Sequence, residues 1–560
     1  METKIERMNC RLQEMKNERS SFDGHWKEVA QFTQPRLGRF ITTDVNKGDK
    51  RYRSIINSAA TQAVRVARAG LHAGVMSPAR PWFSLETSNP DLMESQAVKV
   101  WLSQVTLLLQ TIFAKSNLYT MAPTLLGELL TFGTGAMFHL DDYDTVARFY
   151  TMTIGQYWLA QNEKLQIDTI LREYQMTTRQ MIQKFGLANV SRGVKDAYDH
   201  GKYENRWDVC HIIHPNTDYE DGHPMAKKFA FASCYWEPKS DEKDKVLEEG
   251  GFQEFPVICP RWEVTGEDVY ATDCPGMTAL GDVKGLQVAE KRLAQGVDKQ
   301  VNPPLKGPAS LKGQQISSLP GGVTLYDGDP QRERLEPLYN VAPQVGELTR
   351  NIDRIERRIK QAFFEDLFRS IASMEGVQPQ NELFLTQQRQ ETLLQLGPML
   401  ERLHNEGITK IIDRTFNQCM RAKPSLLPPA PPELQGQPLQ VSYVSPLMTA
   451  QRAVATSNID RVTAYIGGLA AAGFPQAADK FDADQAVDEY ANALGVPPKL
   501  IVPDEQVAQI RQQRQQAQQA AQTMGMVQAG AGAAKDLASA DTSGPNALTA
   551  LTQGVQNGGR

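Results

Sequence analysis

Two long helical segments joined by a short loop, between Ala342 and Arg421, constrain the fold of this chain most strongly. The first runs from about Pro343 to Phe368. Its apolar residues recur at steps of three and four, which predicts one apolar stripe along a helix with a charged opposite face. The stripe consists of Val345, Leu348, Ile352, Ile355, Ile359, Phe363 and Leu367. At about 1.5 Å per residue the helix would be roughly 35–40 Å long.

The loop after this helix, Arg369–Gln380, contains small and turn-forming residues, and a second, longer helical run, Asn381–Arg421, follows it. Gly397-Pro398 is a candidate kink in that run. Two amphipathic arms joined by a small-residue loop predict a rod with a tip rather than an active site. The periodicity alone also fits two ordinary core helices of a bundle, so the rest of the chain must decide between them.

The length and charge of the chain narrow its class. With 560 residues it exceeds one compact core, which predicts several substructures. Its formal net charge of −5 provides no global basic field for nucleic acid. Six scattered cysteines without a CxxC pair are typical of a reduced intracellular setting. The charged N-terminus lacks the apolar core of a signal peptide. No apolar run reaches about 18 residues, so no membrane span is expected.

The order of elements predicts an α+β fold that is predominantly α-helical. Helices are expected at Met1–Gln31, Arg51–Leu71, Val98–Ser116, Pro123–Phe132, Thr177–Phe185 and Gly276–Val301. Strands are expected at Ala136–Leu140, Val146–Thr153, Arg206–His214, Lys227–Trp236, Pro256–Trp262 and Leu439–Val444. Asn302–Ala342 is turn-rich. Late helices are expected at Thr449–Leu469, Gln485–Leu494 and Val507–Ala521, before the Gly/Ala/Ser-rich Gly525–Arg560, whose composition is typical of disorder.

The sequence gives no positive reason to expect catalysis or a cofactor. It contains neither GxxxxGK[ST] nor GxSxG. Cys210, His211, His214 and Cys234 form the most metal-like group, but their spacing fits no usual zinc pattern, and alternation around His211 predicts a strand. Asp141, Asp142 and Asp144 could hold a divalent cation in a nuclease-like site, although a solvated turn between two strands is the more usual setting for such residues.

Several motifs in order resemble the portal, or head-to-tail connector, proteins of short-tailed bacteriophages. The early ones include Trp26-Lys27-Glu28-Val29-Ala30, Arg51 to Leu71, Ser77 to Leu85, Ser116-Asn117-Leu118-Tyr119, Leu130 to Ala136 and Arg172-Glu173. The late ones are Ala362 to Phe368, Leu396-Gly397-Pro398, Arg414-Thr415-Phe416 and Ser445-Pro446-Leu447. None is decisive alone, but their order and spacing are specific over roughly residues 20–455.

The resemblance implies a portal fold with wing, stem, clip and crown, assembled as a ring, usually of twelve subunits in this family. The implied parts are a wing at Met1–Pro275, stem helices at Gly276–Val301 and Pro343–Phe368, a clip at Asn302–Ala342, a tunnel loop at Arg369–Gln380, a long wing helix and return strand at Asn381–Val444, a crown at Ser445–Gly525 and a tail at Met526–Arg560. It also implies a structural protein of the virion, at one capsid vertex, assembled in the host cytoplasm.

The resemblance further implies partners and contact residues. The partners are further copies of the chain, the major capsid protein, a scaffold protein, the large terminase subunit, a tail adaptor protein, and double-stranded DNA that passes without sequence specificity; no membrane is implied. The expected DNA-facing loop residues are Arg369, Ser370, Ser373, Met374, Glu375 and Gln378. Stem packing is assigned to Ile352, Ile355, Ile359 and Phe363, and clip docking to Lys306, Lys312, Gln314 and Tyr326.

Two other functions remain open from the sequence. One is an internal scaffold or core protein of the virion, although such proteins are usually more polar than a chain with seven tryptophans. The other is the metal-dependent nuclease that Asp141, Asp142 and Asp144 could support.

A mildly acidic chain also suits a channel that lets DNA slide, because Lys and Arg contacts to phosphates would hold the DNA in place.

Overall fold

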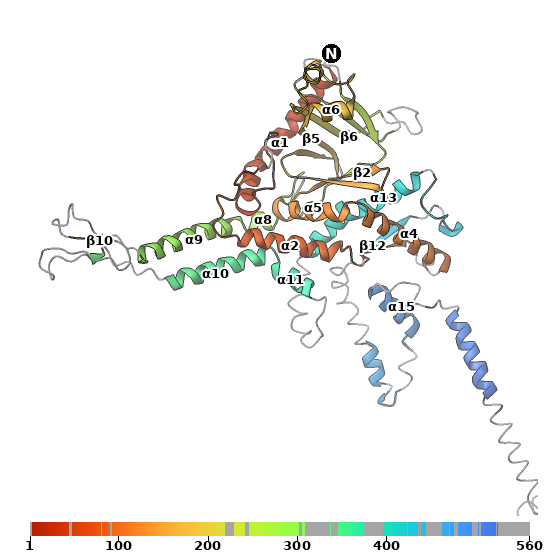
Figure 1. The fold of residues 1–560 in the computed structure, drawn as a ribbon. Helices are drawn as coiled ribbons and strands as arrows, with labels where there is room; N and C mark the ends of the chain where they lie inside the picture. The colour runs from red at the N-terminus through yellow and green to blue at the C-terminus, as the bar shows by residue number, and fades with distance from the viewer. Residues whose placement is uncertain are drawn as a thin grey trace, which may run out of the picture. The chain divides into compact units, whose positions relative to one another are not determined.

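A computed structural model describes most of residues 3–301, the segments 305–307, 336–337 and 345–373, most of 396–443, and parts of 462–524. The chain divides into two compact units. The first consists of Met1–Ser88 and Trp101–Ser457, and the second of Asn89–Val100 and Asn458–Arg560. The first unit combines long helices with antiparallel sheets (Figure 1).

The first helix, α1 at Lys4–Thr33, begins with a capping box. The Thr3 hydroxyl accepts from the backbone N–H of Glu6, and the Glu6 carboxylate accepts from the N–H of Thr3. Two donors that a helix start would otherwise leave unpaired are satisfied in this way. The buried side of α1 includes Trp26 and Val29, which join the main apolar core.

Five antiparallel strands form a meander in which each strand pairs with its sequence neighbours. They are β4 Tyr157–Gln161, β5 Ile167–Thr177, β6 Arg206–Pro215, β7 Phe231–Trp236 and β8 Glu248–Phe252. The first half of α1 covers one face of this sheet through a cluster that includes Leu12, Trp158 and Ile212. Helices α6, Thr178–Phe185, and α7, Arg192–Asp199, lie in the β5–β6 connection and close a second cluster around Val209.

A three-stranded sheet lies below the first and extends its core (Figure 1). Helix α5, Leu118–Phe132, ends at Gly133, which takes a left-handed φ of 78° that suits glycine. The chain then enters β2, which pairs on one side with β3 and on the other with β9. These strands are β2 Ala136–Asp142, β3 Val146–Met152 and β9 Val257–Ile258.

A third sheet joins segments that are distant in the sequence. Strand β1, Phe83–Thr87, pairs antiparallel with β12, Leu439–Tyr443. Helix α13, Thr409–Arg421, follows a π-helical turn at His404–Ile408. The short helix η4, Pro432–Leu434, precedes β12.

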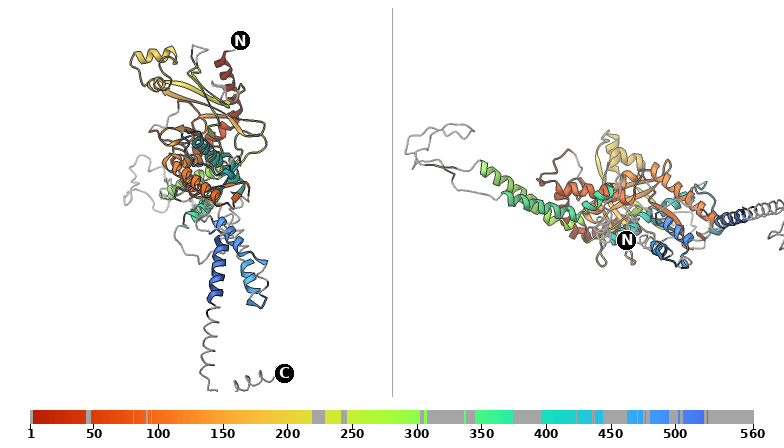
Figure 2. Two further views of the ribbon diagram at one scale, coloured as in Figure 1. Left: turned by 90° about the vertical axis from the view of Figure 1, so that its right-hand side faces the viewer. Right: turned by 90° about the horizontal axis from the view of Figure 1, so that it is seen from below.

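Helices α9 and α10 lie side by side and run away from the sheets of the same unit, as the views in Figures 1 and 2 agree. α9 is Leu280–Val301, preceded by the short α8, Pro275–Thr278, and α10 is Val345–Ala362. Helices α2, Ala59–Val75, and α11, Glu365–Ser373, pack together beside the inner ends of this pair. Beyond α9, β10, Leu305–Lys306, pairs with β11, Glu336–Pro337.

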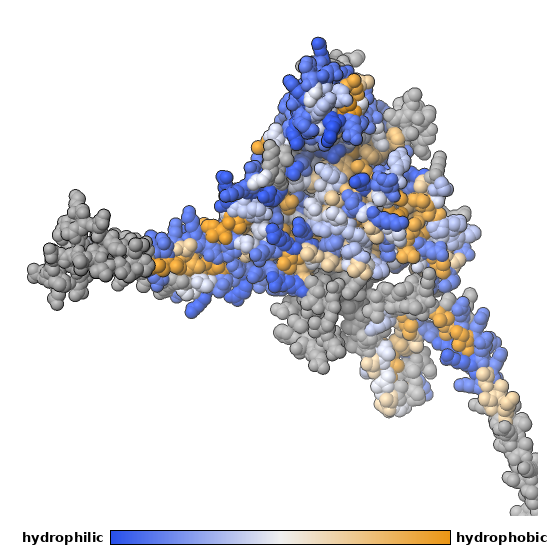
Figure 3. Space-filling model, in the orientation of Figure 1, coloured by the Kyte–Doolittle hydropathy of each residue, from blue (hydrophilic) through white to orange (hydrophobic). Residues whose placement is uncertain are grey.

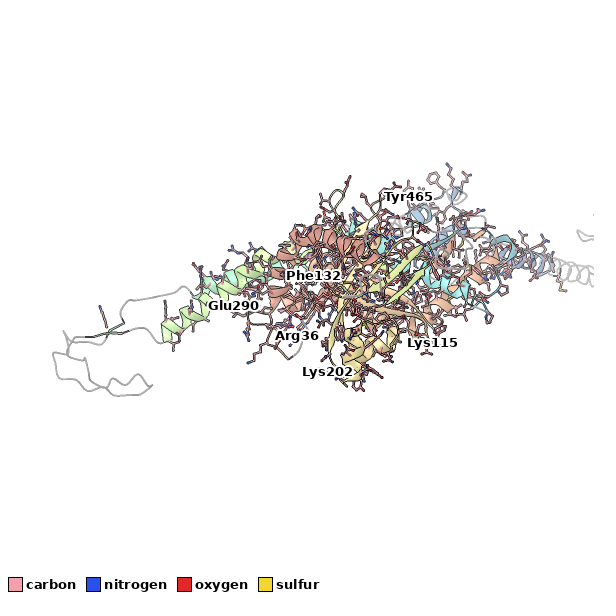
Figure 4. All side chains as sticks on the ribbon, turned by 90° about the horizontal axis from the view of Figure 1, so that it is seen from above. Arg36, Lys115, Phe132, Lys202, Glu290 and Tyr465 are labelled. Atoms are coloured by element: carbon pink, nitrogen blue, oxygen red, sulfur yellow. The ribbon has the colours of Figure 1, made fainter. Side chains whose placement is uncertain are left out.

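The described residues of the second unit include several helices. α15 is Ala483–Leu494, and further helical stretches cover residues 462–469 and 506–521. Arg511 forms two hydrogen bonds of 2.7 Å with the carboxylate of Asp484, which ties the last stretch to α15. Tyr465, labelled in Figure 4, is 68% exposed.

Helix α4, Gln96–Lys115, is the one helix among the described residues that is long and apolar enough to cross a membrane by length and composition, and it was not singled out from the sequence. A core helix passes the same test, and Leu102, Val105 and Leu109 of α4 are buried. The Trp101 indole also donates to the carbonyl of Pro428 at 3.0 Å, so α4 is an integrated part of the body.

Most predicted elements are present, but three predictions were wrong in detail. The helix expected at Arg51–Leu71 begins only at Ala59. The arm expected to run unbroken to Phe368 is interrupted after Ala362. The strand expected at Pro256–Trp262 shrinks to two residues. The candidate kink at Gly397-Pro398 stays a prediction, because the helical stretch is described only from residue 396 onward. The tail Gly525–Arg560 lies outside the described residues.

Candidate functional site: the paired helices and their anchor

The apolar stripe predicted for the first arm is buried from Ile352 to Leu367. Ile352, Ile355 and Ile359 of α10 are 4%, 7% and 0% exposed, and Phe363 beyond them is 0% exposed. On α9, Val283 and Leu286 are likewise buried. The two helices therefore meet through aliphatic side chains at their inner ends, and burial of each such side chain is worth about 1.5–3 kcal/mol.

Asn57 anchors both helices to the start of α2. Its side-chain N–H₂ group donates to Glu290 of α9 at 2.8 Å and to Glu356 of α10 at 2.7 Å. Its side-chain oxygen accepts from the N–H of Ala59 at 2.8 Å, at the start of α2. Because both amide protons are committed to carboxylates on different helices, one residue fixes three helices.

Gln287 completes this anchor from inside α9. The side chain is only 5% exposed, and its oxygen accepts from the N–H groups of Ile56 and Asn57 at 2.6 and 2.8 Å. Its amide group donates back to the carbonyl of Asn57 at 3.0 Å. Figure 4 labels the neighbouring Glu290 on α9. These bonds pair backbone groups of Ile56 and Asn57, which lie in a bend before α2. From the sequence, these two residues were expected to be part of a helix.

Two ion pairs supplement the anchor at the surface. Arg358 of α10 pairs with Asp282 of α9 at 2.6 Å, and Lys284 of α9 pairs with Glu28 of α1 at 2.5 Å. All four side chains are at least a third exposed. Exposed pairs of this kind contribute at most about 1 kcal/mol to stability. They therefore help to orient the helices but add little to the strength of their packing.

The chain turns sharply where the predicted arm should have continued. Phe364 has a φ of +54°, a left-handed conformation that is costly for an aromatic residue. The turn lets Phe363, which lies in the turn itself, and Phe368 on α11 both be buried. Phe368 packs so closely on α2 that a Cβ added at Gly70 would lie 2.3 Å from its Cβ. A buried aromatic contact thus outweighs helix continuity.

The same turn moves the predicted tunnel-loop boundary. α11 extends to Ser373, so Arg369, Ser370 and Ser373 lie on a helix instead of a loop. Arg369 is paired with the carboxylate of Glu365 one turn earlier, at 2.6 Å. Met374, Glu375 and Gln378 lie outside the described residues.

The predicted clip residues are mostly outside the described part as well. Lys306 lies on the short strand β10 and is exposed. Lys312, Gln314 and Tyr326 lie outside the described residues.

The helix pair combines a local excess of positive charge with exposed apolar side chains. α9 and α10 carry nine Lys or Arg against six Asp or Glu, a local net charge of +3 in a chain of −5. The mildly acidic charge of the whole chain is therefore not evenly distributed. Val288, Val297 and Val301 of α9 are 49%, 41% and 79% exposed. Figure 3 shows apolar patches along this pair.

The metal-like group predicted near His211 is divided by the sheet. Cys210 and Cys234 lie in the apolar cluster under α1. His211 points the other way, stacked on Tyr235 with ring centroids 3.7 Å apart. Its nitrogens contact Arg172 at 3.1 Å and Ser233 at 2.9 Å. Burial, and then the charge of Arg172, hold the pKa of His211 well below its usual range.

Two of the three aspartates proposed for a nuclease, Asp141 and Asp142, have structural partners. Asp141 contacts the guanidinium of Arg414 at 3.6 Å and accepts from the side chain of Gln418. Asp142 accepts from the Thr145 hydroxyl at 2.6 Å across the β2–β3 turn. Among the residues that the structure describes, no group of three or more His, Cys, Asp or Glu side chains is placed to hold a metal ion.

Comparison with known proteins identifies the family of this chain. Residues 6–502 match the family described as bacteriophage head to tail connecting protein. The portal protein of Salmonella phage epsilon15 is 43% identical over 550 residues, 98% of each chain. A probable portal protein of Bordetella phage BPP-1 is 41% identical over 541 residues, 96% of each chain. Among solved structures, a neck chain of an empty gene transfer agent particle shows 12% identity and a TM-score of 0.36, over 83% of this chain and 99% of that one. Such a score carries no weight for the fold.

The chain therefore belongs to the bacteriophage head-to-tail connecting protein family. The relatives are portal proteins, so its role is that of a structural portal or connector component of the virion rather than of an enzyme. The anchor residues Asn57 and Gln287 were missed from the sequence. The pair Asn57-Ser58, both residues that favour helix starts, could have signalled that α2 begins there.

Proposed function

We propose that this chain is one subunit of a ring of twelve at one capsid vertex, through which double-stranded DNA enters and leaves without sequence recognition. The chain belongs to the connector family, and its α9–α10 pair is anchored at one end. The observation that carries the proposal is that this pair exposes three valines along α9. Exposed apolar surface on a fixed helix favours a second surface that covers it. In a ring, neighbouring copies supply that surface.

In this proposal the helix pair is the stem and the sheet-bearing region up to Pro275 is the wing. Asn302–Ala342 would be the clip, where the large terminase subunit and later a tail adaptor dock. The long wing helix and return strand, Asn381–Val444, would lead back to a crown at Ser445–Gly525. The wing would contact the major capsid protein, with a scaffold protein assisting assembly in the host cytoplasm.

The tunnel loop is proposed on revised bounds, after the end of α11 at Ser373. Deleting Met374–Gln378 should leave assembly intact but impair genome packaging or retention, because the deleted residues would face the DNA. Particles that fill with DNA and retain it normally would refute this assignment. The local charge of +3 on the helix pair adds a condition: basic side chains must be kept from the phosphates or be balanced by acidic neighbours.

Light scattering of the purified chain tests the assembly directly. A twelve-subunit ring has a mass of about 750 kDa, twelve times the 62.4 kDa of one chain. We expect that mass, or a closely related closed ring, and its loss in Val297→Asp, at the outer end of α9. A chain that stays at 62.4 kDa across salt and protein concentrations, with and without a scaffold protein, would contradict the proposal.

A further inference from the structure

An open strand edge lies in the body, away from the helix pair. β4 begins at Tyr157, which pairs with Arg172 of β5. The last contact on that side of β5 is the N–H of Glu173, which donates to the carbonyl of Gln156 at 3.3 Å. β5 nevertheless continues to Thr177, paired with β6 on its other side only. Residues between Glu173 and Thr177 therefore have one edge without a strand among the described residues.

The backbone of Gln175 faces this open edge. In an antiparallel strand, the N–H and C=O groups of alternate residues point to the same side. The backbone N–H of Glu173 points away from β6, so the backbone N–H and C=O groups of Gln175 and Thr177 do as well. The N–H of Thr177 is satisfied by the side chain of Gln180 at 2.9 Å. The backbone N–H and C=O groups of Gln175 have no hydrogen-bond partner among the described residues. They therefore offer one donor and one acceptor to an incoming strand.

Three hollows surround this edge, and all are lined by Tyr174. One of about 230 Å³ is mainly apolar, with Phe138, Leu140 and Met152 in its wall. It has room for one large apolar side chain. A second, of about 520 Å³, lies toward α1 and is polar. Tyr150, which is 50% exposed, lines both.

The polar hollow has an excess of positive charge. Four basic side chains and two acidic ones line it, which leaves a net charge of +2. Lys16 is paired with Glu173 at 2.8 Å, and Arg19 with Asp23 at 3.0 Å. Arg39 and Arg206 also line the hollow, and neither has an acidic partner among the described residues. They are the groups that would attract a carboxylate from outside.

We propose that the open edge of β5 between Glu173 and Thr177 is a docking site for an extended peptide segment of another protein, in which an apolar residue alternates with an acidic one. The backbone of Gln175 would pair with the segment, as in strand addition to a sheet edge. The apolar side chain fills the pocket beside Phe138, and the carboxylate meets Arg39 and Arg206. A monomer suffices for this binding, so the proposal does not depend on ring formation.

The test uses the full chain and a fluorescein-labelled synthetic peptide of alternating leucine and aspartate, followed by fluorescence anisotropy. We expect saturable binding that falls about tenfold or more in the double variant Arg39→Glu, Arg206→Glu, because both attractive charges become repulsive. The control Lys202→Glu reverses the charge of an exposed side chain that lines none of the three hollows and is labelled in Figure 4, and it should bind as the unaltered chain does. Unchanged urea unfolding of the variants shows that the loss is local.

Two altered peptides separate the contributions. Replacing aspartate by lysine should weaken binding through charge, and methylating the central backbone nitrogens should weaken it through loss of strand pairing. Absence of saturable binding, or equal binding by the lysine peptide, would overturn the proposal. So would an oligothymidylate that binds with the same dependence on Arg39 and Arg206, because the site would then be a nucleic-acid groove. Self-association that the double variant abolishes would identify a second copy as the occupant and also overturn it.

Discussion

The inner and outer halves of the α9–α10 pair are stabilised in different ways. At the inner end, Ile355 and Ile359 are buried and the polar anchor at Asn57 joins three helices. Toward the outer end of α9, Val297 and Val301 are exposed. The inner half is therefore completed within one chain, whereas the apolar surface of the outer half calls for another molecule. Substitutions in the two halves should thus separate folding from assembly.

The largest effect is expected from a charge at the inner end. Ile359→Asp places a carboxylate where the native side chain is 0% exposed, and we expect a loss of about 4 kcal/mol or more in the free energy of unfolding. Urea unfolding followed by circular dichroism measures this. A variant as stable as the unaltered chain would show that the inner half is not a packed core.

The free energy of unfolding should depend on pH in a way that is traceable to one buried group, Glu128. Glu128 of α5 is buried and accepts from the Thr153 hydroxyl at 2.6 Å and the N–H of Ile154 at 2.9 Å. Burial raises its pKa from 4.5 to about 7, more than these hydrogen bonds lower it. The folded state therefore holds the proton where the unfolded state has lost it, and this contribution falls as pH rises from 4.5 to 7.

Comparison with Glu128→Gln isolates this contribution. The difference in unfolding free energy between the unaltered chain and the variant should decline by a few kcal/mol from pH 4.5 to 7 and level off above it. His139 acts oppositely, because burial, followed by the charge of Arg414, lowers its pKa to about 3, which removes stability as pH falls below 6.5. His139 is present in both proteins, so its effect cancels. A difference that stays constant with pH would contradict the assignment to Glu128.

The turn after α10 should be sensitive to one methyl group. Gly70→Ala places a Cβ 2.3 Å from the Cβ of Phe368, so α2 and α11 must separate, at a cost of about 1–3 kcal/mol. Gly285→Ala in α9 is the matched control, because its Cβ would meet nothing within 4 Å. We expect the control to raise stability by up to about 1 kcal/mol, since alanine favours helix. Equal effects at both sites would refute the close contact.

Much of the fold follows from local sequence signals, but its junctions do not. The apolar stripe from Ile352 to Phe363 and the glycine stop at Gly133 are periodic or conformational signals that a sequence displays directly. The break at Phe364 was not visible, because the burial of Phe368 against Gly70 is a contact between distant segments. The pairing of β1 with β12 was missed for the same reason. The anchor at Asn57 required knowing which acidic residues of α9 and α10 face inward.

The smallest effect on stability is expected at the outer end. Val301→Asp changes a residue that is 79% exposed, so unfolding of the isolated chain should shift by no more than about 0.5 kcal/mol. Assembly measured by light scattering should nevertheless decline, because a charge would enter the surface between copies. Normal assembly of this variant would remove Val301 from the contact. A large loss of stability in the isolated chain would instead show that the outer half is packed within one subunit.

Electron cryo-microscopy of the purified assembly tests the central claim most directly. We predict a closed ring in which the α9–α10 pairs of neighbouring copies stand side by side around an axial channel wide enough for a DNA duplex, with the valines of α9 covered. Particles without an axial channel, or rings in which these helix pairs point outward and remain uncovered, would contradict the account.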